Sequence, residues 1–137
     1  MGITLILGGQ AQGKLAYALK LGSYGEQDIV SRGNFRPETF RQKPVIHNLH
    51  EIARLLLEEG TDPFPVVQSR ISQNPEAIIT CCEVGCGIVP MDPKEREYRE
   101  TVGRLCCRIA QAADRVIRIQ SGIPQILKGD APCCPPC

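Results

Sequence analysis

Short apolar runs bounded by glycine, proline or polar residues recur along the chain and predict a series of strands. The first run, residues 3–7, is branched and continuous, and Gly8 and Gly9 stop it. Such a run is typical of a strand buried on both faces of a parallel sheet. We expect strands at residues 3–7, 45–47, 77–82 and 115–120, and a brief strand at residues 28–31. Residues 32–37 are interpreted as a basic loop.

Apolar spacing and terminal signals predict helices between these strands. Residues 14–21 show partial helical spacing before a glycine, and a further helix is expected from about residues 63–65 to the Asn74-Pro75 break. Asn48 is expected to cap a helix that has Glu51 at its N3 position and ends at Gly60.

The longest predicted helix follows Asp92, which is expected to cap it. Pro93 suits the first helical position, and Glu95 falls at N3. Its apolar stripe consists of Tyr98, Val102, Leu105, Ile109 and Ala112. Asp114 ends this pattern before the last strand, and residues 121–124 are expected to turn the chain outward.

Strands alternating with helices in 137 residues predict a single α/β domain with a mostly parallel, doubly wound sheet and helices on both faces. Ligands of such sheets bind beyond the carboxyl ends of the strands, where two glycine-rich segments, residues 8–13 and 85–87, fall. Residues 1–128 are assigned to this nucleotide-binding domain. Residues 129–137, rich in cysteine and proline, are expected to be a disordered tail.

Composition narrows the choice of partners. The chain has the composition of an ordinary globular protein, with 42% hydrophobic and 23% charged residues. Its net charge of +1 creates no strong positive electrostatic field that would attract nucleic acid or an anionic membrane. No apolar run reaches the roughly 18 residues that span a bilayer, and no signal peptide is recognised at the N-terminus. The sequence therefore predicts a cytoplasmic protein with neither nucleic-acid nor membrane partners.

Eight cysteines leave more than one interpretation open. An even count in a short chain can form the disulfide framework of a secreted protein. Here, however, cysteines stand in adjacent pairs at residues 81–82 and 106–107 and crowd the tail, which favours reduced, mostly buried thiols. A soft-metal site joining the tail to Cys81, Cys82 or Cys86 is the weaker interpretation, and no metal site is assigned.

The first glycine-rich segment matches the phosphate-binding loop G-x-x-x-x-G-K-[ST] except at its last position. The loop consists of Gly8, Gly9, Gln10, Ala11, Gln12, Gly13, Lys14 and Leu15. Backbone N–H groups and a helix N-terminus can surround a phosphate there, and Lys14 adds a full positive charge. The predicted ligand is GTP or ATP, with Lys14 as a catalytic residue that stabilises the transferred group.

Leu15 departs from the motif, because the hydroxyl usual at that position holds the Mg²⁺ that bridges the outer phosphates. Mg²⁺ is still expected with the nucleotide, but without this ligand. Two alternatives to a working loop remain: a loop that binds phosphate and transfers it poorly, and an ordinary glycine-rich turn with a solvated lysine.

The second glycine-rich segment begins a longer pattern. Glu-Val-Gly-Cys-Gly-Ile-Val-Pro at residues 83–90 is followed by Tyr98-Arg99, Gly103-Arg104, Ala112-Ala113-Asp114, Val116 and Ser121-Gly122-Ile123. With the loop at residues 8–14, this pattern resembles the adenosylcobinamide kinase/adenosylcobinamide-phosphate guanylyltransferase family, as a shortened, divergent member.

This resemblance implies a RecA-like P-loop domain, homo-oligomers, and a place in cobalamin (vitamin B12) biosynthesis. The implied reactions are phosphorylation of adenosylcobinamide by a nucleoside triphosphate and transfer of GMP from GTP to adenosylcobinamide phosphate through a guanylylated histidine.

Several family features are absent. Residues 31–43, where the resemblance would place the guanylylated histidine, contain none, and the acidic second strand motif with its following helix is missing between residues 59 and 65. His47 and His50 are the only alternative histidines, and packing or capping also explains them. Two asparagines of the family pattern are Cys82 and Cys106 here.

Glu83 is the second candidate catalytic residue, since a carboxylate at a strand end beside a phosphate loop can orient a metal-bound water or a substrate hydroxyl. A structural role in holding the turn at residues 85–87 is the alternative. Arg99 and Arg104 either reach phosphates or form surface ion pairs on their helix.

Three functions therefore compete. The first is an enzyme that phosphorylates adenosylcobinamide, transfers GMP, or does both. The second is a catalytically lapsed paralogue or partner subunit that still binds nucleotide. The third and weakest is a cysteine-rich metal or redox protein.

Overall fold

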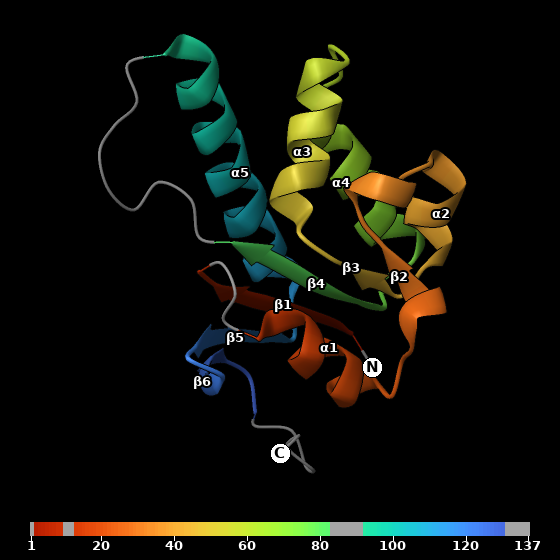
Figure 1. Cartoon of the computed structure of the whole chain (residues 1–137), viewed down its shortest axis with the longest axis vertical. Helices are drawn as coiled ribbons and strands as arrows, with labels where there is room; N and C mark the ends of the chain where they lie inside the picture. The colour runs from red at the N-terminus through yellow and green to blue at the C-terminus, as the bar shows by residue number, and fades with distance from the viewer. Residues whose placement is uncertain (1, 10–12, 83–91, 131–137) are drawn as a thin grey trace.

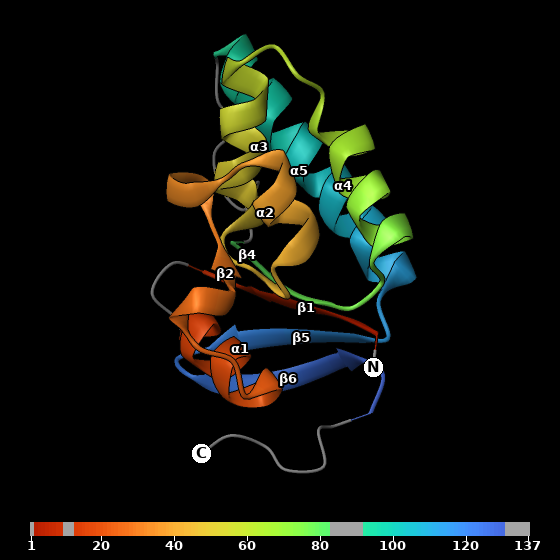
Figure 2. The same cartoon turned by 90° about the vertical axis from the view of Figure 1, so that its right-hand side faces the viewer.

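The computed structural model describes residues 2–9, 13–82 and 92–130 and shows an α/β fold around one sheet (Figure 1). The strands are β1 (Ile3–Gly8), β2 (Ile29–Val30), β3 (Val45–Ile46), β4 (Ala77–Cys82), β5 (Arg115–Gln120) and β6 (Ile123–Lys128). They form a six-stranded sheet in the order β2-β3-β4-β1-β5-β6. The first five strands are parallel, and β6 runs antiparallel to β5 at the edge (Figure 2). The expected fold class, a mostly parallel sheet flanked by helices, is confirmed.

Helices cover the two faces of this sheet unequally. The helices are α1 (Lys14–Gly22), α2 (Pro37–Gln42), α3 (Leu49–Glu58), α4 (Pro63–Gln73) and α5 (Pro93–Ala112), with short 3-10 turns at Glu26–Asp28 and Arg32–Asn34. On one side of β1 and β4 lie α3, α4 and α5, and on the other lies α1 (Figure 1). In the described part of the chain, no helix is both long and apolar enough to cross a membrane.

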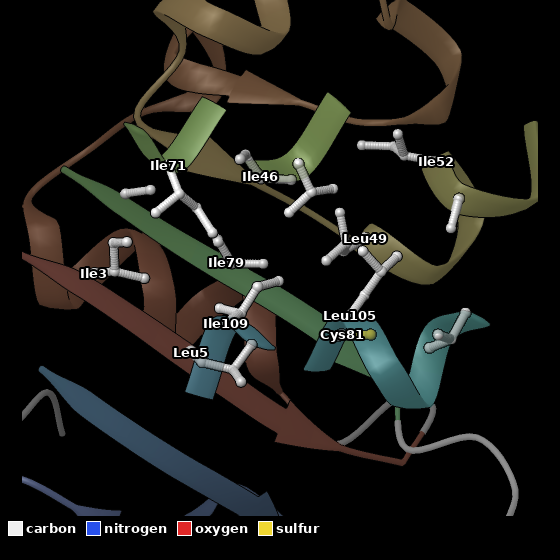
Figure 3. Close-up of a cluster of buried hydrophobic side chains, with 14 of the residues drawn as sticks. Ile3, Leu5, Ile46, Leu49, Ile52, Ile71, Ile79, Cys81, Leu105 and Ile109 are labelled. Carbon is white, nitrogen blue, oxygen red and sulfur yellow. The ribbon is translucent and has the colours of Figure 1, made fainter. Parts of the chain in front are cut away.

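Strand β1 occupies the middle of the sheet and contributes to both cores. Leu5 packs in the larger core, beneath α3, α4 and α5, whereas Ile6 packs in the smaller core beneath α1 (Figure 3). Both side chains are completely buried, as expected for alternating residues of a strand covered on both faces. The continuous apolar run at residues 3–7 was therefore correctly interpreted.

The predicted helix starts were only partly right. Asp92 does cap α5, since its carboxylate accepts a hydrogen bond from the Lys94 amide at 2.9 Å. The carboxylate of Glu95 instead pairs with Arg54 of α3 at 2.7 Å, and that guanidinium also lies over the Tyr98 ring. Asn48 precedes α3 as predicted, but it adopts a left-handed conformation with φ 54° and makes no side-chain cap.

Two elements were not predicted. Helix α2 begins at Pro37 and buries only Phe40, so its sequence carries almost no helical periodicity. Residues 121–124 were expected to turn the chain outward, whereas Ser121 and Gly122, with φ of 51° and 75°, form a tight turn that returns the chain as β6. Positive φ at both central residues is the geometry that a two-residue hairpin favours.

Arg70 of α4 ties together the segments that enter β3 and β4. Its side chain is almost fully buried, and its guanidinium donates hydrogen bonds to the backbone carbonyls of Phe40, Lys43, Asn74 and Glu76. Burial lowers the pKa of Arg70. These four carbonyls solvate the buried cation in place of water, and the planar guanidinium is what allows one side chain to reach them.

Replacing Arg70 is therefore expected to destabilise the whole sheet. We expect Arg70→Met to lower the free energy of unfolding by about 3 kcal/mol, because several buried carbonyls would lose their donors. Urea unfolding followed by circular dichroism measures the change. Arg32→Met is the matched control: Arg32 forms an exposed ion pair with Glu58, worth at most about 1 kcal/mol. Equal losses in the two variants would contradict the role given to Arg70.

Candidate functional site

The carboxyl ends of the three central strands lie level with one another and define one edge of the sheet. Gly8, the last residue of β1, is paired in register with Cys82 of β4 and with Ile119 of β5. A side-chain carbon at Gly8 would lie 2.5 Å from the Ile119 carbonyl oxygen. The first glycine of the predicted loop is thus already required by the packing of the strands.

Gly13 joins the loop to α1 and adopts the left-handed conformation, with φ 88°. A side-chain carbon added there would lie 3.8 Å from the Cα of Gly122, so the end of the loop lies close to the β5–β6 turn. The first turn of α1 contains no acidic residue. Its N-terminus is consequently left with the partial positive charge that favours an anion.

Lys14 brings its charge back over the strand ends. The residue is only 5% exposed, and its Nζ donates to the Gly9 carbonyl oxygen at 2.6 Å and lies 3.5 Å from the Cys82 Sγ. The ammonium group therefore lies between the loop and the end of β4. Neither of these two described partners, a carbonyl oxygen and a thiol, carries a negative charge that would neutralise the ammonium group.

His47 follows β3 and lies level with the buried Thr80 of β4. Its Nδ1 is 2.8 Å from Thr80 Oγ1, which also accepts a hydrogen bond from the Asn48 amide at 2.8 Å. Because that amide is a donor, the hydroxyl hydrogen of Thr80 satisfies both groups when it points to His47 Nδ1. Burial, and secondly the charge of Lys14, lower the pKa of His47.

His50 lies in the first turn of α3, where it reaches the end of β4. Its Nδ1 accepts a hydrogen bond from the Cys82 backbone amide at 3.2 Å, so this nitrogen carries no proton. Burial is the main cause that lowers the pKa of His50; the charge of Lys14 acts in the same direction, and Glu51 opposes it. Both histidines are thus held neutral beside Lys14.

The described part of the predicted loop, namely Gly8, Gly9, Gly13, Lys14 and Leu15, lies at this edge of the sheet. Gln10, Ala11 and Gln12 lie outside the described residues, as do Glu83 and the turn at residues 85–87. Arg104 is exposed on α5, and the charge of Arg99 contributes, after Arg54, to the lowered pKa of Glu95.

Sequence reasoning missed three contributors to the edge: Thr80, Cys82 and Gly122. The signal for Cys82 was available, because a residue that ends a parallel strand beside β1 must lie level with the start of the phosphate loop. The proximity of His47 and His50 to Lys14 was not anticipated, since it depends on which strand β3 pairs with.

The described residues offer no preformed set of side chains that would hold a Mg²⁺ ion by themselves. Leu15 supplies no oxygen ligand, and the described residues contain no group of three or more His, Cys, Asp or Glu side chains able to hold a metal ion. Mg²⁺ is a hard cation that requires oxygen ligands in near-octahedral geometry. The site as described is suited to an anion instead.

Four cysteines lie in the described residues, and none of these four is in a disulfide. Cys81 is buried, Cys82 and Cys106 are partly buried, and Cys107 is exposed. The prediction of mostly buried thiols is therefore wrong for Cys107. Cys86 and the cysteines of the tail lie outside the described residues.

A protein-family model matches part of the chain. The family model described as cobinamide kinase / cobinamide phosphate guanyltransferase matches residues 62–127, just under half of the 137 residues. This match confirms the resemblance drawn from the sequence over α4, β4, α5 and β5, and it does not include the loop at residues 8–15 or either histidine. The search of curated proteins found no significant match.

The lowered pKa of His50 leads to a prediction about pH. In the unfolded chain a histidine takes up its proton near pH 6.5, whereas in the folded protein it does so only at lower pH. The unfolded state then binds more protons below about pH 6.5, so stability is complete above that pH and falls as the pH decreases.

We expect the free energy of unfolding, measured by urea titration between pH 7.5 and pH 5, to fall less steeply for His50→Asn than for the wild type. Asparagine can keep an acceptor for the Cys82 amide and does not titrate. The comparison concerns slopes, so a constant loss of stability in the variant does not affect it. Parallel profiles would show that His50 is not held neutral.

Proposed function

Because the chain is related through residues 62–127 to the cobinamide kinase / cobinamide phosphate guanyltransferase family, we propose that it binds a nucleoside triphosphate and phosphorylates adenosylcobinamide. The family match supports the broader role, a step of cobalamin biosynthesis with nucleotide and cobinamide substrates. The specific reaction is our proposal.

The observation that carries this proposal is the position of Lys14. Its ammonium group is held at the carboxyl edge of the sheet beside the uncapped N-terminus of α1, where it contacts the Gly9 carbonyl oxygen and the Cys82 sulfur. A triphosphate entering this edge would replace the weak thiol contact with charge-assisted hydrogen bonds. Lys14 would then stabilise the negative charge on the phosphoryl group in transfer.

In the phosphorylation reaction the acceptor is a hydroxyl of the substrate, so the protein need not form a covalent intermediate. It has to position the reactants and stabilise the charge on the transferred group. This suits an edge that offers backbone amides and a lysine. Mg²⁺ normally accompanies a nucleoside triphosphate, but the described residues give it no ligand set, so no step is assigned to it here.

GMP transfer is the second candidate, supported by the two histidines beside Lys14. A neutral imidazole attacks with its unprotonated nitrogen. In His50 that nitrogen, Nδ1, is engaged by the Cys82 amide, and in His47 it faces Thr80. His50 would have to exchange its proton between nitrogens before its Nε2 could accept GMP, and His47 would have to do so when Thr80 donates to its Nδ1. The geometry therefore favours phosphorylation over GMP transfer.

Removal of the lysine charge provides the first test. We expect Lys14→Met to weaken binding of GTP and ATP by about 10-fold to 100-fold, the effect of losing a charge-assisted contact. Calorimetric titration with and without magnesium measures the affinity. Lys20→Met removes a lysine from the same helix further from the loop and is expected to leave affinity unchanged. Equal affinity in wild type and Lys14→Met would rule out the proposed nucleotide site.

Activity is tested by incubating the protein with adenosylcobinamide and GTP or ATP and identifying products by mass spectrometry. We expect adenosylcobinamide phosphate as the product, and a higher rate in Leu15→Ser, which restores a hydroxyl at the position usual for a metal ligand. A GMP adduct on His47 or His50 would favour the second candidate.

Binding of nucleotide without either product, in the wild type and in Leu15→Ser, would identify a lapsed paralogue or a partner subunit. Stoichiometric zinc in the purified protein would support the cysteine-rich metal protein instead. A homo-oligomer remains the expected assembly, and sedimentation velocity measures it in the same preparations.

A further inference from the structure

Two thiols that the proposed nucleotide site does not use lie against each other between the sheet and α5. Cys81 is the penultimate residue of β4, Cys106 lies in the C-terminal half of α5, and their sulfur atoms are 3.6 Å apart. Figure 3 shows the Cys81 sulfur next to the Leu105 turn of α5. We propose that these two cysteines form a redox site, which a small-molecule disulfide such as oxidised glutathione converts into an intramolecular disulfide linking β4 to α5.

The geometry needs little change for this bond to form. A disulfide places its sulfur atoms about 2 Å apart, so the two atoms must approach by less than about 2 Å. Rotation of the two side chains is the movement that would bring the sulfur atoms together. Strand β4 and helix α5 are both packed in the larger core, where the neighbouring residues Ile79 of β4 and Leu105 of α5 are buried.

The two thiols differ in a way that sets the order of reaction. Cys106 is partly exposed and can meet an oxidant, whereas Cys81 is completely buried. The hydrogen bond with Cys106, followed by burial, raises the pKa of Cys81, and its thiol also lies 3.5 Å from the Cys82 carbonyl oxygen. Cys106 is therefore the thiol that reacts first with the oxidant, and Cys81 is the resolving thiol.

The reaction balances in two exchange steps. The Cys106 thiolate attacks one sulfur of oxidised glutathione, which forms a mixed disulfide and releases one glutathione. The Cys81 sulfur then attacks the Cys106 sulfur and releases the second glutathione. In total, one oxidised glutathione is reduced to two glutathione thiols, which carry the protons lost by the two cysteines. The protein gains one disulfide.

The neighbouring cysteines provide matched controls. Cys82 follows Cys81 on the strand, so its side chain points to the opposite face, where its sulfur lies near Lys14. Cys107 follows Cys106 on α5 and is exposed. A disulfide that formed only because cysteines are abundant would include these residues equally, whereas the proposed site selects one pair.

The test uses the full chain treated with oxidised glutathione, then alkylated and digested for peptide mapping by mass spectrometry. We expect a linked peptide pair containing Cys81 and Cys106, absent from Cys106→Ser, retained in Cys107→Ser and reversed by dithiothreitol. The bond closes a ring through residues 82–105, so oxidation is expected to raise the Tm by on the order of 10 °C in wild type and in Cys107→Ser only.

The proposal is overturned if Cys106 stops at the glutathione adduct, or if the linked pair involves other cysteines equally in wild type and Cys106→Ser. Cys106→Ala serves as a second variant should the serine alter folding, and the mapping of the wild type needs no variant. The inference does not rest on the proposed kinase function, because neither Cys81 nor Cys106 is assigned to nucleotide binding and the readout is covalent.

Discussion

Parallel pairing of β1 with strands on both sides is the constraint on which the rest of the structure depends. Its register with β4 and β5 brings Gly8, Cys82 and Ile119 to the same level, and the loop that leads to Lys14 begins beyond that level. The short β3 extends the same arrangement, so that His47 meets Thr80 two residues before the end of β4. The location of the candidate site is thus a consequence of strand register, with the glycine-lysine loop as one of several segments that reach it.

The candidate site places the Lys14 side chain beside two histidines whose pKa values are lowered. Burial is the first cause of the lowered pKa for both histidines, and the positive charge of Lys14 adds to it. An anion that bound at Lys14 would offset this second cause, so it would raise the pKa of His47 and His50.

The sequence allowed prediction of those parts whose signals are local. Asp92 and the apolar stripe predicted α5, and the continuous run at residues 3–7 predicted β1. Long-range features could not be inferred: Arg70 is solvated by four carbonyls from the two segments that enter β3 and β4, and the histidines reach Lys14 only because β3 pairs with β4. Asn48 failed as a predicted cap because asparagine also tolerates the left-handed conformation it adopts here.

The order of the strands has a consequence for synthesis on the ribosome. Strand β1 precedes both of its neighbours in the chain: β4 begins at Ala77 and β5 only at Arg115. Until β5 emerges, a segment that is apolar on both faces lacks the partner that completes its hydrogen bonding. The nascent chain therefore carries β1 with an unpaired edge over the more than one hundred residues that separate it from β5, and the sheet can close only after β5 is made.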